Sequence, residues 1–231
     1  MAVDINRVYQ KVLALANKEQ RGYITPQEFN LFADKAQLEI FENYFHGVKM
    51  AERKPKNQMD YADELEMVEE KLHPFHFDET VTTDSATLTL PTNMYKIINI
   101  TRSGNQITQI NKSEIAYTEN SPLTKATLIR STFVREDSGL ITIYPAPTSL
   151  LPEEFEVSYY KRPTVPSWGY VVINDKALHN NNTSVNFELH GSEEENLVYK
   201  ILMLAGLTMK QPDVQQSAAA GIQMNKQEQN S

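Results

Sequence analysis

The sequence predicts an α+β protein: a helical bundle, made by N-terminal and C-terminal helices packed together, with an inserted antiparallel β-sandwich or barrel module. Two observations predict this fold. Apolar residues recur at helical spacing near both ends of the chain, whereas the period shortens to two between them. Several short strand-like segments in that middle region are separated by turn sequences. We expect the parts to be residues 1–77, 78–190 and 191–231.

The most sharply marked helix begins at Pro26. The Thr25 side chain can accept from the Glu28 backbone N–H, and the Glu28 side chain can reach back to the Thr25 N–H, which together make a capping box. Proline suits the first helical position because its missing donor costs nothing there. We therefore expect a helix from Pro26 to about Phe45.

This helix carries two apolar stripes on nearly opposite sides. The wider stripe consists of Phe29, Phe32, Ala33, Ala36, Ile40 and Tyr44. We expect it to pack on the preceding amphipathic segment, residues 5–16, which follows a possible cap at Asp4. The second stripe is covered either by a third helix of the same chain or by a neighbouring subunit. The candidate oligomer-interface residues are therefore Leu31, Leu38 and Phe45.

Three more helices are predicted. One occupies residues 60–72 and ends before Pro74, which disfavours helix at the preceding residue. A second capping box at Ser192 precedes a helix, up to residue 207, that is apolar on most sides and must be central. The last helix runs from Val214 to about Met224. If helices from both ends of the chain pack together, one core should contain Phe32, Ile40, Leu197 and Ile201.

The middle region reads as short strands with alternating or β-branched residues. Gly104 and Gly139 stand in good hairpin loops, and prolines interrupt the pattern elsewhere. Residues 177–184 read as a surface loop. The predicted strands are residues 86–90, 95–101, 106–110, 126–135, 140–144, 155–160, 170–173 and 185–189.

Composition narrows the class of protein. The N-terminus lacks a secretory pattern, and no stretch approaches the length of an apolar membrane span, so we expect a soluble protein with no membrane partner. The formal charge of -8 opposes a surface that grips phosphates. An acidic balance still allows DNA to pass along the protein without being bound.

No catalytic residue, cofactor or metal site is predicted. The glycines stand singly, so they build no phosphate cradle, and cysteine is absent. Pro74 lies between His73 and His76, which favours a packing or turn role over a shared metal. Residues 17–28 resemble a calcium loop, but Arg21 stands where an oxygen ligand is needed.

Three stretches resemble the head–tail connector, or ring protein, family of tailed bacteriophages. They are residues 8–17, residues 22–30 (Gly22-Tyr23-Ile24-Thr25-Pro26-Gln27-Glu28-Phe29-Asn30) with residues 36–41, and residues 88–97 (Leu88-Thr89-Leu90-Pro91-Thr92-Asn93-Met94-Tyr95-Lys96-Ile97). The sequence is most similar to the tail tubular protein A type of adaptor in short-tailed phages, including the ring proteins of crAss-like phages. Residues 163–189 carry no matching motif.

The resemblance implies a non-enzymatic virion protein of the portal–tail region, synthesised in the host bacterial cytoplasm. It implies a homo-oligomeric ring, a dodecamer, beneath the portal protein. Such a ring extends the channel used in DNA ejection and offers a docking face for tail or further ring proteins. The acidic balance suits a channel through which genomic DNA slides without sequence-specific binding.

One alternative function rests on the β module and Trp168. A tryptophan beside Gly169 could serve as a platform for a sugar or a base, which would make the protein a carbohydrate- or nucleotide-binding accessory protein. A lone tryptophan in a β segment is more often a core or interface residue.

Overall fold

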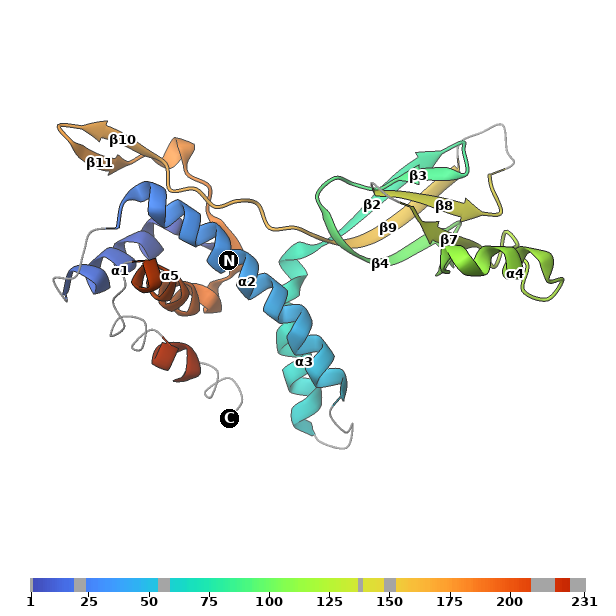
Figure 1. The fold of residues 1–231 in the computed structure, drawn as a ribbon, viewed down its shortest axis with the longest axis horizontal. Helices are drawn as coiled ribbons and strands as arrows, with labels where there is room; N and C mark the ends of the chain where they lie inside the picture. Colours follow the sequence, from blue (N-terminus) through green and yellow to red (C-terminus); the bar gives the residue numbers. More distant parts are fainter. Residues whose placement is uncertain are drawn as a thin grey trace. The chain divides into compact units, whose positions relative to one another are not determined.

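The computed structural model describes residues 2–18, 24–53, 59–136, 139–147, 153–208 and 219–224 (Figure 1). The chain forms two compact units. The helical unit comprises Met1–Pro74 and Pro163–Ser231, and the β unit comprises Phe75–Arg162. The predicted α+β class is confirmed: helices from both ends of the chain pack together, and the β unit is inserted between them in the sequence.

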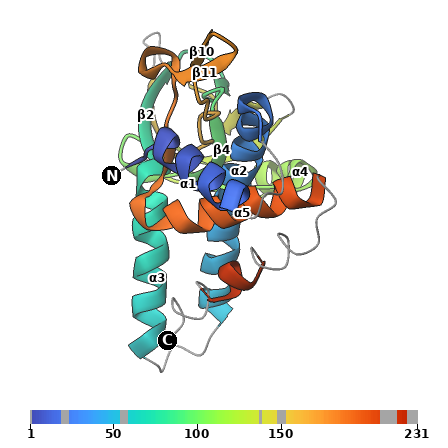
Figure 2. The same ribbon diagram turned by 90° about the vertical axis from the view of Figure 1, so that its left-hand side faces the viewer.

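Helices from both chain ends build the helical unit, as Figures 1 and 2 show in two views. Helix α2 packs against α3 and α5, and α1 packs against α5. The helices are α1 (Ile5–Lys18), α2 (Pro26–Arg53), α3 (Met59–Leu72) and α5 (Glu194–Thr208). Residues 219–224 are also helical, whereas the rest of the predicted last helix lies outside the described residues. Within the described residues, no helix is long and apolar enough to cross a membrane.

Buried apolar residues of α1, α2 and α5 form the core of this unit. Ile40, Leu197 and Ile201 are all buried, as predicted. Phe32 is only half-buried, because it lies about 90° around α2 from the centre of the buried stripe. The buried face of α2 continues instead through Gln37 and Phe41.

The predicted N-terminal caps of α1 and α2 are present. The Arg7 N–H donates to Oδ1 of Asp4 at 3.0 Å. The Thr25 N–H donates to Oε2 of Glu28 at 3.0 Å, and the Glu28 N–H donates to Oγ1 of Thr25 at 3.3 Å. Helix α2 continues past the predicted end at Phe45 to Arg53, since no proline or cap interrupts it there.

The start of α5 differs from the prediction. A 3₁₀ turn, Gly191–Glu193, precedes the helix, which begins at Glu194. The cap is His190 rather than Ser192, because the Ser192 N–H donates to Nδ1 of His190 at 3.3 Å.

Four short strands also belong to the helical unit. Strand β1 (Ala2–Val3) pairs with β12 (Phe187–His190), and β10 (Tyr170–Ile173) pairs with β11 (Lys176–His179), both antiparallel. The sequence pattern assigns residues 163–190 to the β module, whereas in the structure they lie in the helical unit. Their partners there are the N-terminal strand β1 and, through Trp168, helices α1 and α2.

The β unit is a sandwich of two four-stranded sheets, ordered β2-β9-β4-β5 and β3-β8-β7-β6. Its core draws residues from both sheets, including Ile100, Phe155, Ile141 and Phe133. All pairs are antiparallel except β6 with β7. The strands are β2 (His76–Thr83), β3 (Thr87–Thr89), β4 (Met94–Arg102), β5 (Asn105–Gln106), β6 (Thr108–Gln109), β7 (Thr132–Arg135), β8 (Leu140–Tyr144) and β9 (Glu153–Lys161).

The connection between β6 and β7 departs from the sequence prediction. It contains a 3₁₀ turn, Lys112–Glu114, and the short helix α4 (Ile115–Asn120). The spacing of apolar residues in the sequence does not predict this helix. Strand β7 begins at Thr132 instead of Ala126, because residues 127–131 form a turn closed by the Thr127 N–H donating to the Arg130 carbonyl at 3.2 Å.

Candidate assembly surfaces

The three predicted interface residues do not share one environment. Leu31 is 73% exposed, so it presents its side chain to solvent near the start of α2. Leu38 and Phe45 are half-buried, and the Phe45 ring packs edge-on against Phe41 with centroids 5.1 Å apart. Of the predicted stripe, only Leu31 is a fully open surface residue.

Trp168 fixes the segment before β10 to both N-terminal helices. Its side chain is 2% exposed and its Nε1–H donates to Oδ1 of Asn6 on α1 at 3.0 Å. Its ring lies 4.2 Å from the Tyr9 ring, centroid to centroid. On α2, Oδ1 of Asn30 accepts from the Trp168 N–H at 2.8 Å, and Nδ2 of Asn30 donates to the Trp168 carbonyl at 3.4 Å. A ring buried in this way cannot offer an open platform to a sugar or a base.

Gly169 allows the chain to pass close to the loop that follows β11. A Cβ at this position would stand 2.7 Å from the Thr183 carbonyl carbon and 2.9 Å from the Ser184 nitrogen, closer than real Cβ contacts. The Gly169 N–H donates to Oγ of Ser184 at 3.0 Å, and Nε2 of His179 lies 2.9 Å from the same oxygen. The absence of a side chain at residue 169 therefore lets the hairpin base close.

The β10–β11 hairpin, called the arm below, carries exposed apolar residues on both of its faces. Val171, Val172, Ile173 and Leu178 are each about half exposed or more, and Val172 reaches 61%. Its turn, Asn174-Asp175, has positive φ at both residues, as a two-residue type I′ hairpin requires. At the base of the arm, the Tyr170 and His179 rings stack on Trp168. An isolated two-stranded hairpin is at best marginally stable in water, so these contacts help to hold the arm in place.

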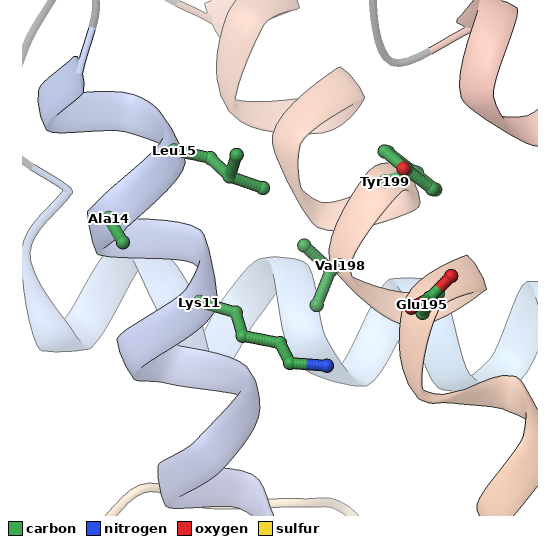
Figure 3. A pocket seen from close by; sticks show the side chains of 6 residues that line it. All are labelled: Lys11, Ala14, Leu15, Glu195, Val198 and Tyr199. Atoms are coloured by element: carbon green, nitrogen blue, oxygen red, sulfur yellow. The ribbon is translucent and has the colours of Figure 1, made fainter.

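A groove lies between α1 and α5 (Figure 3). It has a volume of about 300 Å³. Leu15 extends from α1 into the space between the helices, and Val198 extends toward it from α5. The residues that line it are Lys11, Ala14, Leu15, Glu195, Val198 and Tyr199. Sequence reasoning missed this groove because it depends on how far apart two helices lie.

An ion-pair cluster between α1 and α5 includes Lys11, one of the residues that line the groove. Glu194 accepts from Nε of Arg7 at 2.9 Å and from Nζ of Lys11 at 2.7 Å, both through Oε1. These ion pairs join α1 to α5 and leave one more cation than carboxylate in the cluster. Arg7 and Lys11 are partly exposed, so the contribution of these pairs to stability is small. The charged residues in the groove lining itself are Lys11 and Glu195.

A second exposed apolar patch lies in the β unit, between β6 and β7. It consists of Tyr117, Leu123, Leu128 and Ile129, with Leu123 85% exposed. Arg130 holds the loop, because its Nη2 donates to the Leu123 carbonyl at 2.7 Å. Clustered exposed apolar residues of this kind mark interaction surfaces.

Buried titratable groups link helices of the helical unit. Glu193 is buried, accepts from Nζ of Lys71 at 2.9 Å, and joins α3 to the start of α5. Burial, together with the nearby Glu193 carboxylate, raises the pKa of Tyr44 far above its usual value. Among the residues that the structure describes, no three His, Asp or Glu side chains gather as a metal site would require.

The two sequence patterns that resemble metal sites are the calcium-like loop and the pair His73 and His76, and the described residues of both make other contacts. Glu28 is the last position of the calcium-like loop, and its carboxylate accepts hydrogen bonds from the backbone N–H and the hydroxyl of Thr25. These hydrogen bonds lower the pKa of Glu28. Arg21 lies outside the described residues. His76 is exposed and its Nδ1 stands 3.9 Å from a carboxylate oxygen of Asp78, whereas His73 belongs to a 3₁₀ turn.

The SU10 adaptor protein family matches residues 58–229, about three quarters of the chain. The chain belongs to this family. The sequence-based resemblance to phage head–tail adaptors is thereby confirmed. No match was found among curated proteins.

Membership of the SU10 adaptor protein family indicates what the exposed surfaces can contact. A phage adaptor is a virion component, and it contacts other virion components. The matched residues contain the arm, the β unit with its apolar patch, and the α5 side of the groove. Helices α1 and α2, including Leu31, precede them.

Proposed function

We propose that this protein is a structural head–tail adaptor that forms a ring, a dodecamer, at the portal–tail junction. The ring extends the DNA channel beneath the portal protein and docks tail or further ring proteins, without catalysing a reaction. The observation that carries the proposal is the match to an adaptor family in a chain whose arm and β6–β7 patch expose clustered apolar side chains. Such clusters are uncommon on proteins that work as monomers.

Ring assembly requires two different, complementary patches on each subunit, because the contacts of a ring are heterologous. The helical unit offers an apolar projection, the arm, and an apolar hollow, the α1–α5 groove. The net charge of -8 supports the channel role, since a net acidic protein gives DNA little to adhere to.

Leu31, Leu38 and Phe45 remain proposed contributors to the subunit contact. Leu31→Ala removes an exposed side chain, so it should weaken assembly and leave the melting temperature unchanged. Leu38→Ala and Phe45→Ala remove half-buried side chains, and both should also lower the melting temperature. Unchanged assembly for all three variants would place the ring contacts elsewhere.

The proposal is tested by the mass of the purified protein with and without the cognate portal protein. Mass photometry should show species at multiples of the 26.4 kDa subunit, and electron microscopy should show rings, at least when the portal is present. A protein that stays monomeric and does not bind the portal would refute the adaptor function. The carbohydrate- or nucleotide-binding alternative loses Trp168 as its platform, because that side chain is buried.

A further inference from the structure

We propose that the arm of one subunit docks into the α1–α5 groove of a second copy of the chain; this inference rests on the ring proposed above. The arm is Tyr170–His179 and the groove is the hollow lined from Lys11 to Leu15 and from Glu195 to Tyr199. The contact would be repeated from subunit to subunit in one direction.

The arm and the groove match in chemistry. The arm offers aliphatic side chains on both faces, with Val172 the most exposed, while the groove floor includes Leu15 and Val198. The groove has room for about ten water molecules by volume. Displacing water from an apolar hollow by an apolar side chain is favourable by roughly 25 cal/mol per Å² of surface buried.

The charges at the two surfaces also match. The arm tip carries an adjacent anion and cation, Asp175 and Lys176. The groove lining carries one anion, Glu195, and one cation, Lys11, which already pairs with Glu194 at 2.7 Å. An arm lying in the groove can place Lys176 near Glu195, which selects one orientation of the arm.

The occupant has to come from another subunit because the arm and the groove lie on opposite sides of α1. Asn6 and Tyr9 hold the base of the arm through Trp168. Lys11 and Leu15 face the groove. At about 100° per residue, the two pairs point in nearly opposite directions around α1. The anchored arm thus projects away from its own groove.

The experiment uses the natural absence of cysteine from the chain. Two single variants, Ala14→Cys in the groove and Val172→Cys in the arm, are purified separately, mixed and oxidised. Each subunit then has one thiol, so a 14–172 disulfide can form only between subunits. As a matched control, Ala14→Cys is mixed with Leu123→Cys, whose side chain is still more exposed but lies in the β unit.

The mixed 14–172 dimer should form much faster than the 14–123 dimer and than either homodimer. Docking raises the effective concentration of the two thiols from about 10 µM in the assay to about 1 mM, so a rate advantage of roughly 100-fold is expected. The double variant, carrying both cysteines, should give a ladder of linked subunits.

Three results would overturn the docking. The first is a 14–172 pair that links no faster than the 14–123 pair. The second is a double-cysteine variant whose disulfide closes within one chain, so that it runs as a monomer. The third is an Ala14→Cys monomer, at low concentration, that resists a small thiol reagent, which would show that the subunit's own chain fills the groove. If rings still form with the portal in these cases, the adaptor function stands and only the docking fails. If rings are also absent, both proposals fail.

The orientation of the arm is tested by charge exchange. Glu195→Lys should slow the 14–172 cross-link, because the new cation meets Lys176, and adding Lys176→Glu should restore the rate. If the pair that carries both Glu195→Lys and Lys176→Glu links as slowly as the pair with Glu195→Lys alone, the proposed pairing of Glu195 with Lys176 is overturned. Melting temperatures of all variants show whether each subunit is still folded.

Discussion

Replacing Asn30 with alanine tests whether one amide side chain holds the arm on the helical unit. Oδ1 of Asn30 accepts from the backbone N–H of the buried Trp168 at 2.8 Å, and Nδ2 makes a longer bond of 3.4 Å to its carbonyl. In Asn30→Ala the donor is left buried and without an acceptor.

The expected cost follows from that one donor. A buried N–H that loses its acceptor costs about 1–3 kcal/mol, and the longer bond adds little because 3.4 Å is beyond the usual N–H···O range. For a domain of this size, that loss lowers the melting temperature by roughly 2–4 °C per kcal/mol. Asn30→Ala should therefore melt several degrees below the wild type.

The assay can be specific, because Trp168 is the only tryptophan in the chain. Its fluorescence reports on the base of the arm directly, and a red-shifted emission is expected in Asn30→Ala as water reaches the ring. Hydrogen exchange at the Tyr170 amide should also accelerate. Asn30→Asp is the matched control, since its carboxylate keeps an acceptor for the Trp168 N–H. It should recover part of the stability, because its second oxygen would face the Trp168 carbonyl.

The reasoning would be refuted by an Asn30→Ala protein whose melting temperature and tryptophan spectrum both equal those of the wild type. A lower melting temperature with unchanged fluorescence would also refute it, because the damage would then lie away from Trp168.

Further predictions concern single contacts elsewhere in the fold. Glu153→Gln strips the carboxylate from buried Arg102 and should cost about 3 kcal/mol, whereas changing both residues to Met should be near neutral by thermal unfolding. Gly169→Ala should destabilise by about 1–3 kcal/mol by overpacking against the loop after β11; Gly47→Ala, whose Cβ would meet Val68 at 3.6 Å, should stabilise by about 0.5–1 kcal/mol. Hydrogen bonding lowers the pKa of folded Glu28, so its contribution is present above the ordinary carboxyl pKa and lost as pH falls through the folded value. The melting-temperature difference between wild type and Glu28→Gln should shrink in acid, and a constant difference would contradict this.

Local signals predicted the parts of the fold that local chemistry decides. The caps at Asp4 and Thr25 were predictable because each places a donor and an acceptor within three residues. The His190 cap was not, because histidine is not among the residues that usually cap a helix. Strand β12 was predicted as a strand, but its pairing with β1, almost the whole chain length away, leaves no mark in the sequence.

The arm shows why part of the candidate site escaped prediction. Tyr170–Ile173 was predicted as a strand, but its partner Lys176–His179 was assigned to a loop. A strand exposed on both faces need not alternate, and Asn174-Asp175 lacks the glycine that marks most two-residue turns. The helical wheel correctly placed Leu31 and Leu38 on one side of α2, yet tertiary packing alone decides that Leu38 is half-covered and Leu31 open.

The chain enters and leaves the β unit through two neighbouring strands, β2 and β9. The chain passes into it after Pro74 and returns at Pro163, and the strands at these crossings, β2 and β9, pair at His76 and Tyr160. Paired residues in an antiparallel ladder have Cα atoms about 5 Å apart. The whole insertion therefore occupies a gap that a short turn could close. A sequence encoding a different module could replace it without disturbing the host helices, so selection can alter the two halves of the molecule independently.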